Sequence, residues 1–152
     1  RKERKISKGK DFYMVGGMGH ASAVSLGYSA NAKKQVICLD GDGSVLMHLG
    51  SLRNLAYFAK SNLKHILLNN NAHESVGGQK TTANSINFKD LVKSLGYKKY
   101  FKISNNNQIN PTLKKFLKSH GPSFLEVLIS MGTLKKLTRP RNLIIIKNKF
   151  IS

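Results

Sequence analysis

Apolar and polar positions alternate along the chain in short blocks with two different periods. Two apolar runs, at residues 36–39 and 65–68, have the length and β-branched content of buried strands. Between them, apolar side chains recur at helical spacing, which predicts one crossover helix over about residues 44–60. The other blocks predict an extended run at 11–15, helices at 20–30, 88–95 and 111–119, and strands at 100–103 and 124–129.

This alternation of strands and helices predicts an α/β fold, an open parallel sheet with helices on both faces. At 152 residues the chain has the size of one domain. We expect residues 1–10 to be a basic lead or linker and residues 11–152 to form the domain. The tail after Gly132 is basic and contains an apolar run at 143–146, which needs burial, for instance against a partner.

The charge balance is strongly basic, with 26 Lys and Arg residues against 7 Asp and Glu residues and a net charge of +19. Such an excess raises the prospect of nucleic-acid binding. The basic residues are spread along the chain, however, and no RNA-stacking motif, zinc finger or helix-turn-helix signature accompanies them. Biased residue usage from an AT-rich genome explains the excess, and a basic nucleic-acid-binding α/β module is the non-enzyme alternative.

Membrane, disulfide and thiolate-metal classes are disfavoured by the sequence. No apolar run approaches a membrane span, and the start has no apolar segment of a signal peptide. The one cysteine, Cys38, lies inside a predicted strand, which argues against a disulfide scaffold and against a thiolate metal site. We therefore expect a cytoplasmic protein. Because the chain starts with Arg1, a processed or partial polypeptide is also expected.

Polar clusters follow the two apolar runs that flank the crossover helix. Residues 40–44 come after the first run, and Asn69, Asn70 and Asn71 come after the second. The carboxyl ends of parallel strands share one edge of a sheet, so a carboxylate and an amide oxygen can meet there around Mg²⁺. The glycines of the first cluster let backbone N–H groups approach a phosphate. The pattern predicts a diphosphate bridged by Mg²⁺; two ordinary strand-to-loop turns are the alternative.

The spacing of these clusters resembles a known cofactor motif. Gly41-Asp42-Gly43, followed after about twenty-five residues by Asn69-Asn70, resembles the thiamine-diphosphate motif of the thiamine-dependent decarboxylases. Residues 16–22, 41–52 and 68–81 resemble the cofactor-binding half of the phosphonopyruvate decarboxylase branch, and residues 132–140 resemble its closing segment. The similarity covers about residues 11–149.

The resemblance implies a role for each matching residue. The side chains of Asp42 and Asn70 and the backbone carbonyl of Ala72 would bind Mg²⁺. The carbonyl at Gly16 would accept a hydrogen bond from the 4′-amino group of thiamine diphosphate, and Met18 would hold the cofactor in its bent form. The cofactor-binding residues implied in this way are Gly16, Gly17, Met18, Gly41, Gly43, Ser44 and Ala72.

The segment after the second cluster, residues 69–87, is long, polar and rich in glycine, as functional loops often are. Its backbone amides and hydroxyls suit an anionic phosphonate or sulfonate, and the candidate substrate residues are Ser75, Gly78, Gln79 and Thr81. His73 is the candidate for proton transfer. A flexible loop without a ligand is the alternative. The branch usually has glycine where this chain has Asn71, and asparagine also tolerates positive φ.

The resemblance implies a lyase of phosphonate biosynthesis that decarboxylates 3-phosphonopyruvate to phosphonoacetaldehyde and CO₂. A β-type subunit of sulfopyruvate decarboxylase, or of another 2-oxo acid decarboxylase, is the alternative. In this family the glutamate that activates the cofactor belongs to a separate pyrimidine-binding domain, which we do not find in this chain. We therefore expect half an active site, inactive without a pyrimidine-binding domain or subunit, and an oligomer such as a dimer of active-site halves.

Overall fold

The computed structural model describes residues 10–132 and 142–151 of the chain. It divides into two compact units, one formed by residues 19–132 and one formed by the two ends of the chain, residues 1–18 and 133–152. Each unit is described by itself. The larger unit contains the sheet and both polar clusters.

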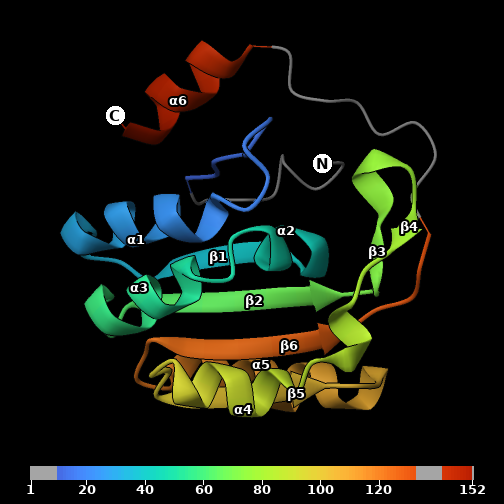
Figure 1. Ribbon diagram of the computed structural model, residues 1–152. Helices are drawn as coiled ribbons and strands as arrows, with labels where there is room; N and C mark the ends of the chain where they lie inside the picture. Colours follow the sequence, from blue (N-terminus) through green and yellow to red (C-terminus); the bar gives the residue numbers. More distant parts are fainter. Residues whose placement is uncertain (1–9, 133–141, 152) are drawn as a thin grey trace. The chain divides into compact units, whose positions relative to one another are not determined.

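A four-stranded parallel sheet with the strand order β1-β2-β6-β5 forms the centre of the larger unit. The arrowheads of neighbouring strands in Figure 1 therefore point the same way. The expected α/β class is confirmed. The strands are β1 (Val36–Gly41), β2 (Leu63–Asn69), β5 (Lys99–Ile103) and β6 (Ser123–Leu128).

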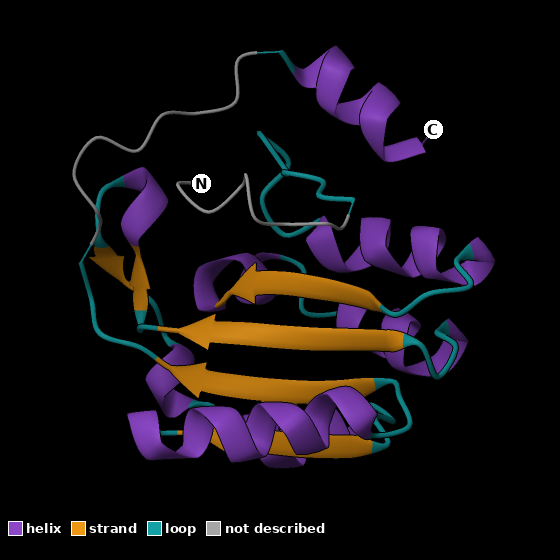
Figure 2. Cartoon of the chain, turned by 180° about the vertical axis from the view of Figure 1, so that it is seen from behind, coloured by secondary structure: helices purple, strands orange, loops and turns teal. Residues whose placement is uncertain are grey.

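Helices cover both faces of this sheet, as the alternating pattern predicted. Helices α2, α3 and α4 lie on the face toward the viewer in Figure 1, and α5 lies on the face toward the viewer in Figure 2. Helix α1 packs against β1 and α3. The helices are α1 (Ala21–Asn31), α2 (Asp42–Met47), α3 (Ser51–Phe58), α4 (Phe88–Ser94) and α5 (Ile109–Lys118).

The two faces of the sheet have separate apolar cores because successive strand residues point to opposite sides. On the α2–α4 face, Leu63, Leu67 and Phe124 are fully buried. On the α5 face, Ile66 and Leu125 pack with Phe116 of α5. Strand β2 is buried on both faces, which explains why Ile66, Leu67 and Leu68 follow one another without alternating polar residues.

The structure corrects one sequence prediction. The single helix expected at 44–60 is two helices, because His48 leaves the helical region, with φ −133° and ψ 51°, and Gly50 precedes the new helix. Apolar spacing continues across this break and so could not reveal it. Residues 11–15, expected to be an extended run, lie outside the helices and strands of the structure.

The segment between β2 and α4 is more ordered than the expected loop. It contains a two-stranded antiparallel hairpin and two short 3₁₀ helices. In Figure 1 the hairpin rises beyond the arrowhead of β2. Its elements are β3 (Ala72–His73), η2 (Glu74–Val76), β4 (Gln79–Lys80) and η3 (Ala83–Ser85), and a further 3₁₀ helix, η4 (Asn106–Gln108), precedes α5.

The smaller unit consists of residues 10–18 and helix α6 (Leu143–Ile151) in its described part. The rings of Phe12 and Phe150 lie 5.2 Å apart between centroids and join these two segments. In the apolar run at 143–146, Ile146 is buried, whereas Ile144 is 70% exposed. The predicted need for burial is thus met at only one of the four positions. Among the described residues, no helix has the length and apolar character needed to cross a membrane.

Candidate functional site

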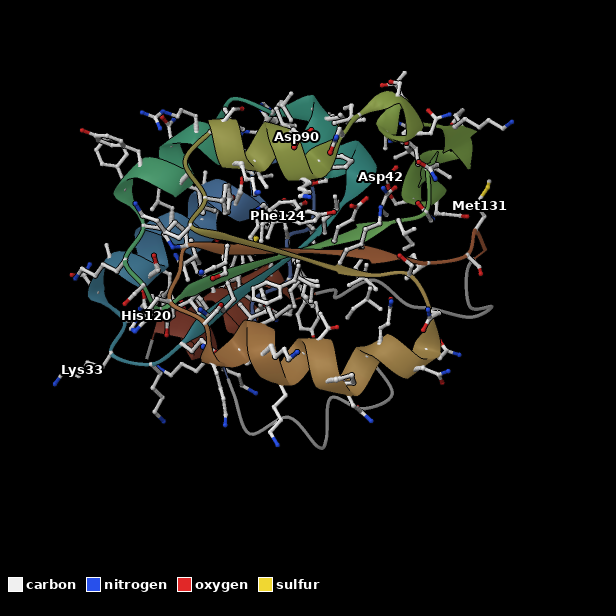
Figure 3. All side chains as sticks on the ribbon, turned by 90° about the horizontal axis from the view of Figure 1, so that it is seen from below. Lys33, Asp42, Asp90, His120, Phe124 and Met131 are labelled. Atoms are coloured by element: carbon white, nitrogen blue, oxygen red, sulfur yellow. The ribbon has the colours of Figure 1, made fainter. Side chains whose placement is uncertain are left out.

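The two polar clusters lie side by side at one edge of the sheet. Gly41, the last residue of β1, pairs in register with Leu68 of the parallel strand β2, so both strands reach this edge together. Asp42 then begins α2, and Asn69 ends β2. Figure 3 shows Asp42 and Met131 at this end of the sheet, with Lys33 and His120 at the other end. The topology thus provides the arrangement that the sequence predicted.

Asp42 is a buried carboxylate, only 1% exposed. The hydroxyl of Thr81 donates a hydrogen bond to its Oδ2. Within the described part of the chain, the carboxylate forms no ion pair. An ionised carboxylate with so little compensation is costly to bury. A bound cation would supply the missing partner, and the site fits one.

The asparagine cluster folds back on itself at the end of β2. Asn69 Oδ1 accepts from the N–H of Asn71 at 3.2 Å, and Asn70 Oδ1 accepts from the N–H of Ala72 at 3.1 Å. Asn71 adopts φ +57°, a positive value that asparagine tolerates. Its buried Oδ1 has no hydrogen-bond partner among the described residues. Amide oxygens are thus concentrated beside Asp42, and one of them is unsatisfied.

Glu126 on β6 anchors this cluster, and the sequence analysis did not assign it a role. Asn69 donates its Nδ2–H to Glu126 Oε1 at 3.0 Å, and Tyr100 donates to Oε2 at 2.5 Å. Lys102 Nζ lies 3.4 Å from Oε2. Burial raises the pKa of Tyr100, and its hydrogen bond to Glu126 raises that pKa further. The sequence signal that could have revealed this role is a single acidic residue, Glu126, inside an otherwise apolar strand.

The ring of His73 packs directly on the backbone of Gly43. A Cβ built at Gly43 would collide with the ring at Nδ1. The glycine is therefore required by a close approach between α2 and the hairpin. One residue further along α2, Ser44 Oγ accepts from the N–H of Gly19 at 3.0 Å. The structure thus brings His73 and the glycine-containing turn together.

The hairpin places most of the predicted substrate residues on its exposed side. Its base is closed by the N–H of Thr81 donating to the carbonyl of Asn71 at 2.9 Å. Ser75 and Gln79 are exposed and Gly78 is half-buried. Thr81 differs, since its buried hydroxyl donates to Asp42. It is placed to position the carboxylate.

Two further contacts frame the site on the side of β6. Glu74 Oε1, in the hairpin, accepts from the N–H of Gly132 at 2.6 Å. The N–H of Ile129 donates to the carbonyl of Asn69 at 3.0 Å. The segment after β6 is therefore tied both to the hairpin and to the asparagine cluster.

Gly16, Gly17 and Met18 belong to the smaller unit. Gly16 and Gly17 both have positive φ, at +73° and +56°, which fits a tight turn rather than a strand. Their contact with the cofactor stays a prediction.

Comparison with known proteins identifies the family. The family model described as "Thiamine pyrophosphate enzyme, C-terminal TPP binding domain" matches residues 4–127. The chain belongs to this family. Thiamine diphosphate is therefore the cofactor of its domain type, and the parallel sheet flanked by helices agrees with that assignment.

Curated relatives of this thiamine pyrophosphate enzyme domain are decarboxylases. Phosphonopyruvate decarboxylase of Streptomyces viridochromogenes is 37% identical over 130 residues, which is 86% of this chain and 33% of that protein. Sulfopyruvate decarboxylase subunit beta of Methanocaldococcus jannaschii is 42% identical over 88 residues, 57% of this chain and 47% of that subunit. Sulfopyruvate decarboxylase of Methanosarcina acetivorans is 34% identical over 123 residues, 80% of this chain and 32% of that protein. The chain spans about one third of the phosphonopyruvate decarboxylases that it matches.

Proposed function

We propose that this chain supplies the diphosphate- and Mg²⁺-binding half of a thiamine-diphosphate-dependent decarboxylase that acts on 3-phosphonopyruvate. The main observation behind this proposal is the carboxylate of Asp42, which is buried without an ion pair in the described part of the chain and lies beside the amide oxygens of the asparagine cluster. Membership of the family supports thiamine diphosphate as the cofactor, and the similarity to phosphonopyruvate decarboxylases supports 3-phosphonopyruvate as the substrate.

Magnesium would be held by oxygen atoms from both strand ends. Asp42 would offer Oδ1, Asn70 its side-chain oxygen, and Ala72 its backbone carbonyl, while phosphate oxygens and water would complete the octahedron. Thr81 holds Asp42 from one side, and the bond between Glu126 and Asn69 steadies the asparagine cluster from the other. Both supports come from residues of this chain, and such outer partners orient the ligands of a metal ion.

The diphosphate would meet the start of α2. Gly41 and Gly43 leave the backbone there without side chains, and Ser44 has a hydroxyl that can donate to an anion while it accepts from Gly19. Gly16, Gly17 and Met18 are proposed to contact the aminopyrimidine end of the cofactor. When bound, thiamine diphosphate supplies the electron sink that decarboxylation of a 2-oxo acid requires.

The hairpin would hold the anionic end of the substrate. The hairpin offers uncharged hydrogen-bond donors: the hydroxyl of Ser75, the backbone amides around Gly78 and the side-chain amide of Gln79. The half-buried His73 lies against Gly43 and can donate or accept a proton near the reacting centre. A phosphonate and a sulfonate are both tetrahedral anions, so the relatives that act on sulfopyruvate make 3-sulfopyruvate the alternative substrate.

A partner would complete the active site. Several relatives are named as beta subunits, which supports a second subunit that provides the pyrimidine-binding half and its activating glutamate. The assembled enzyme would then be an oligomer of such halves.

The metal and cofactor assignment is tested by binding of thiamine diphosphate in the presence of Mn²⁺, an EPR-visible substitute for Mg²⁺. We expect Asp42→Asn and Asn70→Ala to weaken binding by about tenfold or more, since each removes an oxygen ligand. Asp90→Asn is the matched control, because Asp90 is an exposed carboxylate on α4. Equal binding by wild type and Asp42→Asn would refute the proposed site.

The substrate is tested separately in the assembled enzyme. CO₂ release from 3-phosphonopyruvate is compared with that from 3-sulfopyruvate at equal concentrations. A higher kcat/KM for 3-phosphonopyruvate supports the proposal, and a higher value for 3-sulfopyruvate establishes the alternative.

A further inference from the structure

A second group of convergent donors lies inside the larger unit, apart from the site around Asp42. It consists of Cys38 and Asp40 on β1 and His65 on β2, all buried and at most 5% exposed. One sulfur, one carboxylate oxygen and one ring nitrogen from these residues lie within 4.8 Å of one another. Cys38 and Asp40 share a face of β1 because they are two residues apart, and His65 is the register partner of Cys38.

His65 is oriented toward the other two donors. Its Nδ1 is hydrogen-bonded to the hydroxyl of Tyr97 at 2.9 Å. Its Nε2 is buried and has no hydrogen-bond partner among the described residues. The nearest carboxylate oxygen, Asp40 Oδ2, is 3.6 Å away, which is longer than a normal hydrogen bond. Metal-bound histidines commonly show this arrangement, with one nitrogen fixed by an outer partner and the other free for the ion.

The separation of two of the donors is close to what a zinc ion requires. Zinc bonds of about 2.0–2.2 Å at tetrahedral angles place a nitrogen and an oxygen donor about 3.3–3.5 Å apart, and Nε2 and Oδ2 lie 3.6 Å apart. Thiolate and imidazole favour zinc over the magnesium expected at Asp42. In the sequence alone, a single cysteine argued against a thiolate metal site. The fold brings a histidine and a carboxylate next to that cysteine, which together make a set of three donors.

We propose that Cys38, Asp40 and His65 bind a zinc ion that links β1 to β2. The ion would have three protein ligands, and a water molecule would occupy the fourth position. It would lie between the two strands whose ends carry Asp42 and Asn70. Its role would be structural, since it fixes the spacing of the strands that present the candidate cofactor site.

The experiment measures zinc in the purified 152-residue chain after incubation with equimolar ZnCl₂ and dialysis. Elemental analysis should find about one zinc per chain, and cobalt substitution should give the near-ultraviolet thiolate band of a tetrahedral site. Cys38→Ser and His65→Gln should weaken zinc binding by about tenfold or more. His120→Gln, which changes an exposed histidine, should bind as wild type does.

The zinc content of the wild-type chain decides the test, so the result remains valid even if a variant fails to fold. Less than about a tenth of a zinc per chain in folded wild type would overturn the proposal. Zinc retained by Cys38→Ser without the thiolate band would also overturn it. Asp42→Asn should keep its zinc, so this result is independent of the magnesium site.

Discussion

At the scale of single residues, the contact between Gly43 and His73 gives a direct test of the site. Gly43→Ala adds a methyl group where the imidazole ring lies. Overpacking of this kind costs about 1–3 kcal/mol, whereas replacing a helical glycine by alanine gains at most about 1 kcal/mol. We expect Gly43→Ala to lower the free energy of unfolding, measured by urea denaturation.

The control and the rescue use the same assay. Gly41→Ala should be close to neutral, because a Cβ at Gly41 meets nothing within 4 Å and its φ is −94°. In a His73→Ala background the clash is gone, and Gly43→Ala should become neutral or stabilising. Equal effects of Gly43→Ala in both backgrounds would show that the ring does not contact this glycine.

Tyr100 gives a prediction about pH. Burial, and then the hydrogen bond to Glu126, raises the pKa of Tyr100 above its ordinary value of 10. The folded state therefore keeps the phenolic proton at pH values where the unfolded state loses it, so wild-type stability falls as pH rises above about 10. Tyr100→Phe should cost about 1.5–3 kcal/mol near pH 7, the usual worth of a hydrogen bond to a charged group.

The pH series decides whether that cost comes from the phenol. Urea unfolding of both proteins between pH 7 and pH 11 should show the advantage of wild type over Tyr100→Phe shrinking above pH 10. A constant difference across the series would contradict the raised pKa. Asn106→Ala, at an exposed position in η4, serves as the control for general alkaline effects.

At the scale of elements, Thr81 connects the hairpin to α2 through its bond to Asp42. Thr81→Val keeps the shape of the side chain but removes the donor, which leaves the buried carboxylate without its hydrogen bond. We expect faster amide exchange in residues 70–81, with opening made easier by about 1.5–3 kcal/mol. Thr81→Ser retains the hydroxyl and should protect the hairpin nearly as well as wild type.

Thr82→Val is the matched control, because Thr82 is the exposed neighbour of Thr81. Its exchange rates should equal those of wild type. If Thr81→Val and Thr82→Val behave alike, the side-chain bond does not hold the hairpin against α2, and the support proposed for Asp42 fails.

The same elements show what the sequence could and could not reveal. Strand ends were predictable because an apolar run and its polar stop are local signals, and parallel pairing then brings Asp42 beside the asparagine cluster. The break in the helix near His48 was not predictable, because the apolar spacing continues through it. Long-range bonds were also beyond reach: Thr81 and Asp42 are 39 residues apart, and Glu126 and Asn69 are 57 apart.

At the scale of the whole molecule, both apolar cores lie entirely within residues 19–132. We therefore expect residues 19–132 to fold alone with a cooperative transition and a Tm within about 5 °C of the full chain, which corresponds to roughly 1 kcal/mol. A further truncation to residues 32–132 removes α1, whose Ser22 is hydrogen-bonded to Ser51 of α3 at 2.7 Å. It should be clearly less stable in the same calorimetric scan.

Residues 19–132 also separate the two ends of the cofactor. They retain Asp42, Ser44 and Asn70 but lack Gly16 and Met18, so they keep the proposed diphosphate contacts and lose the proposed aminopyrimidine contacts. We expect the truncated chain to bind Mn²⁺ with inorganic pyrophosphate as the full chain does. The full chain should prefer thiamine diphosphate to pyrophosphate, and the truncated chain should lose that preference, because the missing residues are the ones of this chain that we propose to contact the ring. Equal preference in both would exclude Gly16 and Met18 from cofactor binding while leaving the metal site unaffected.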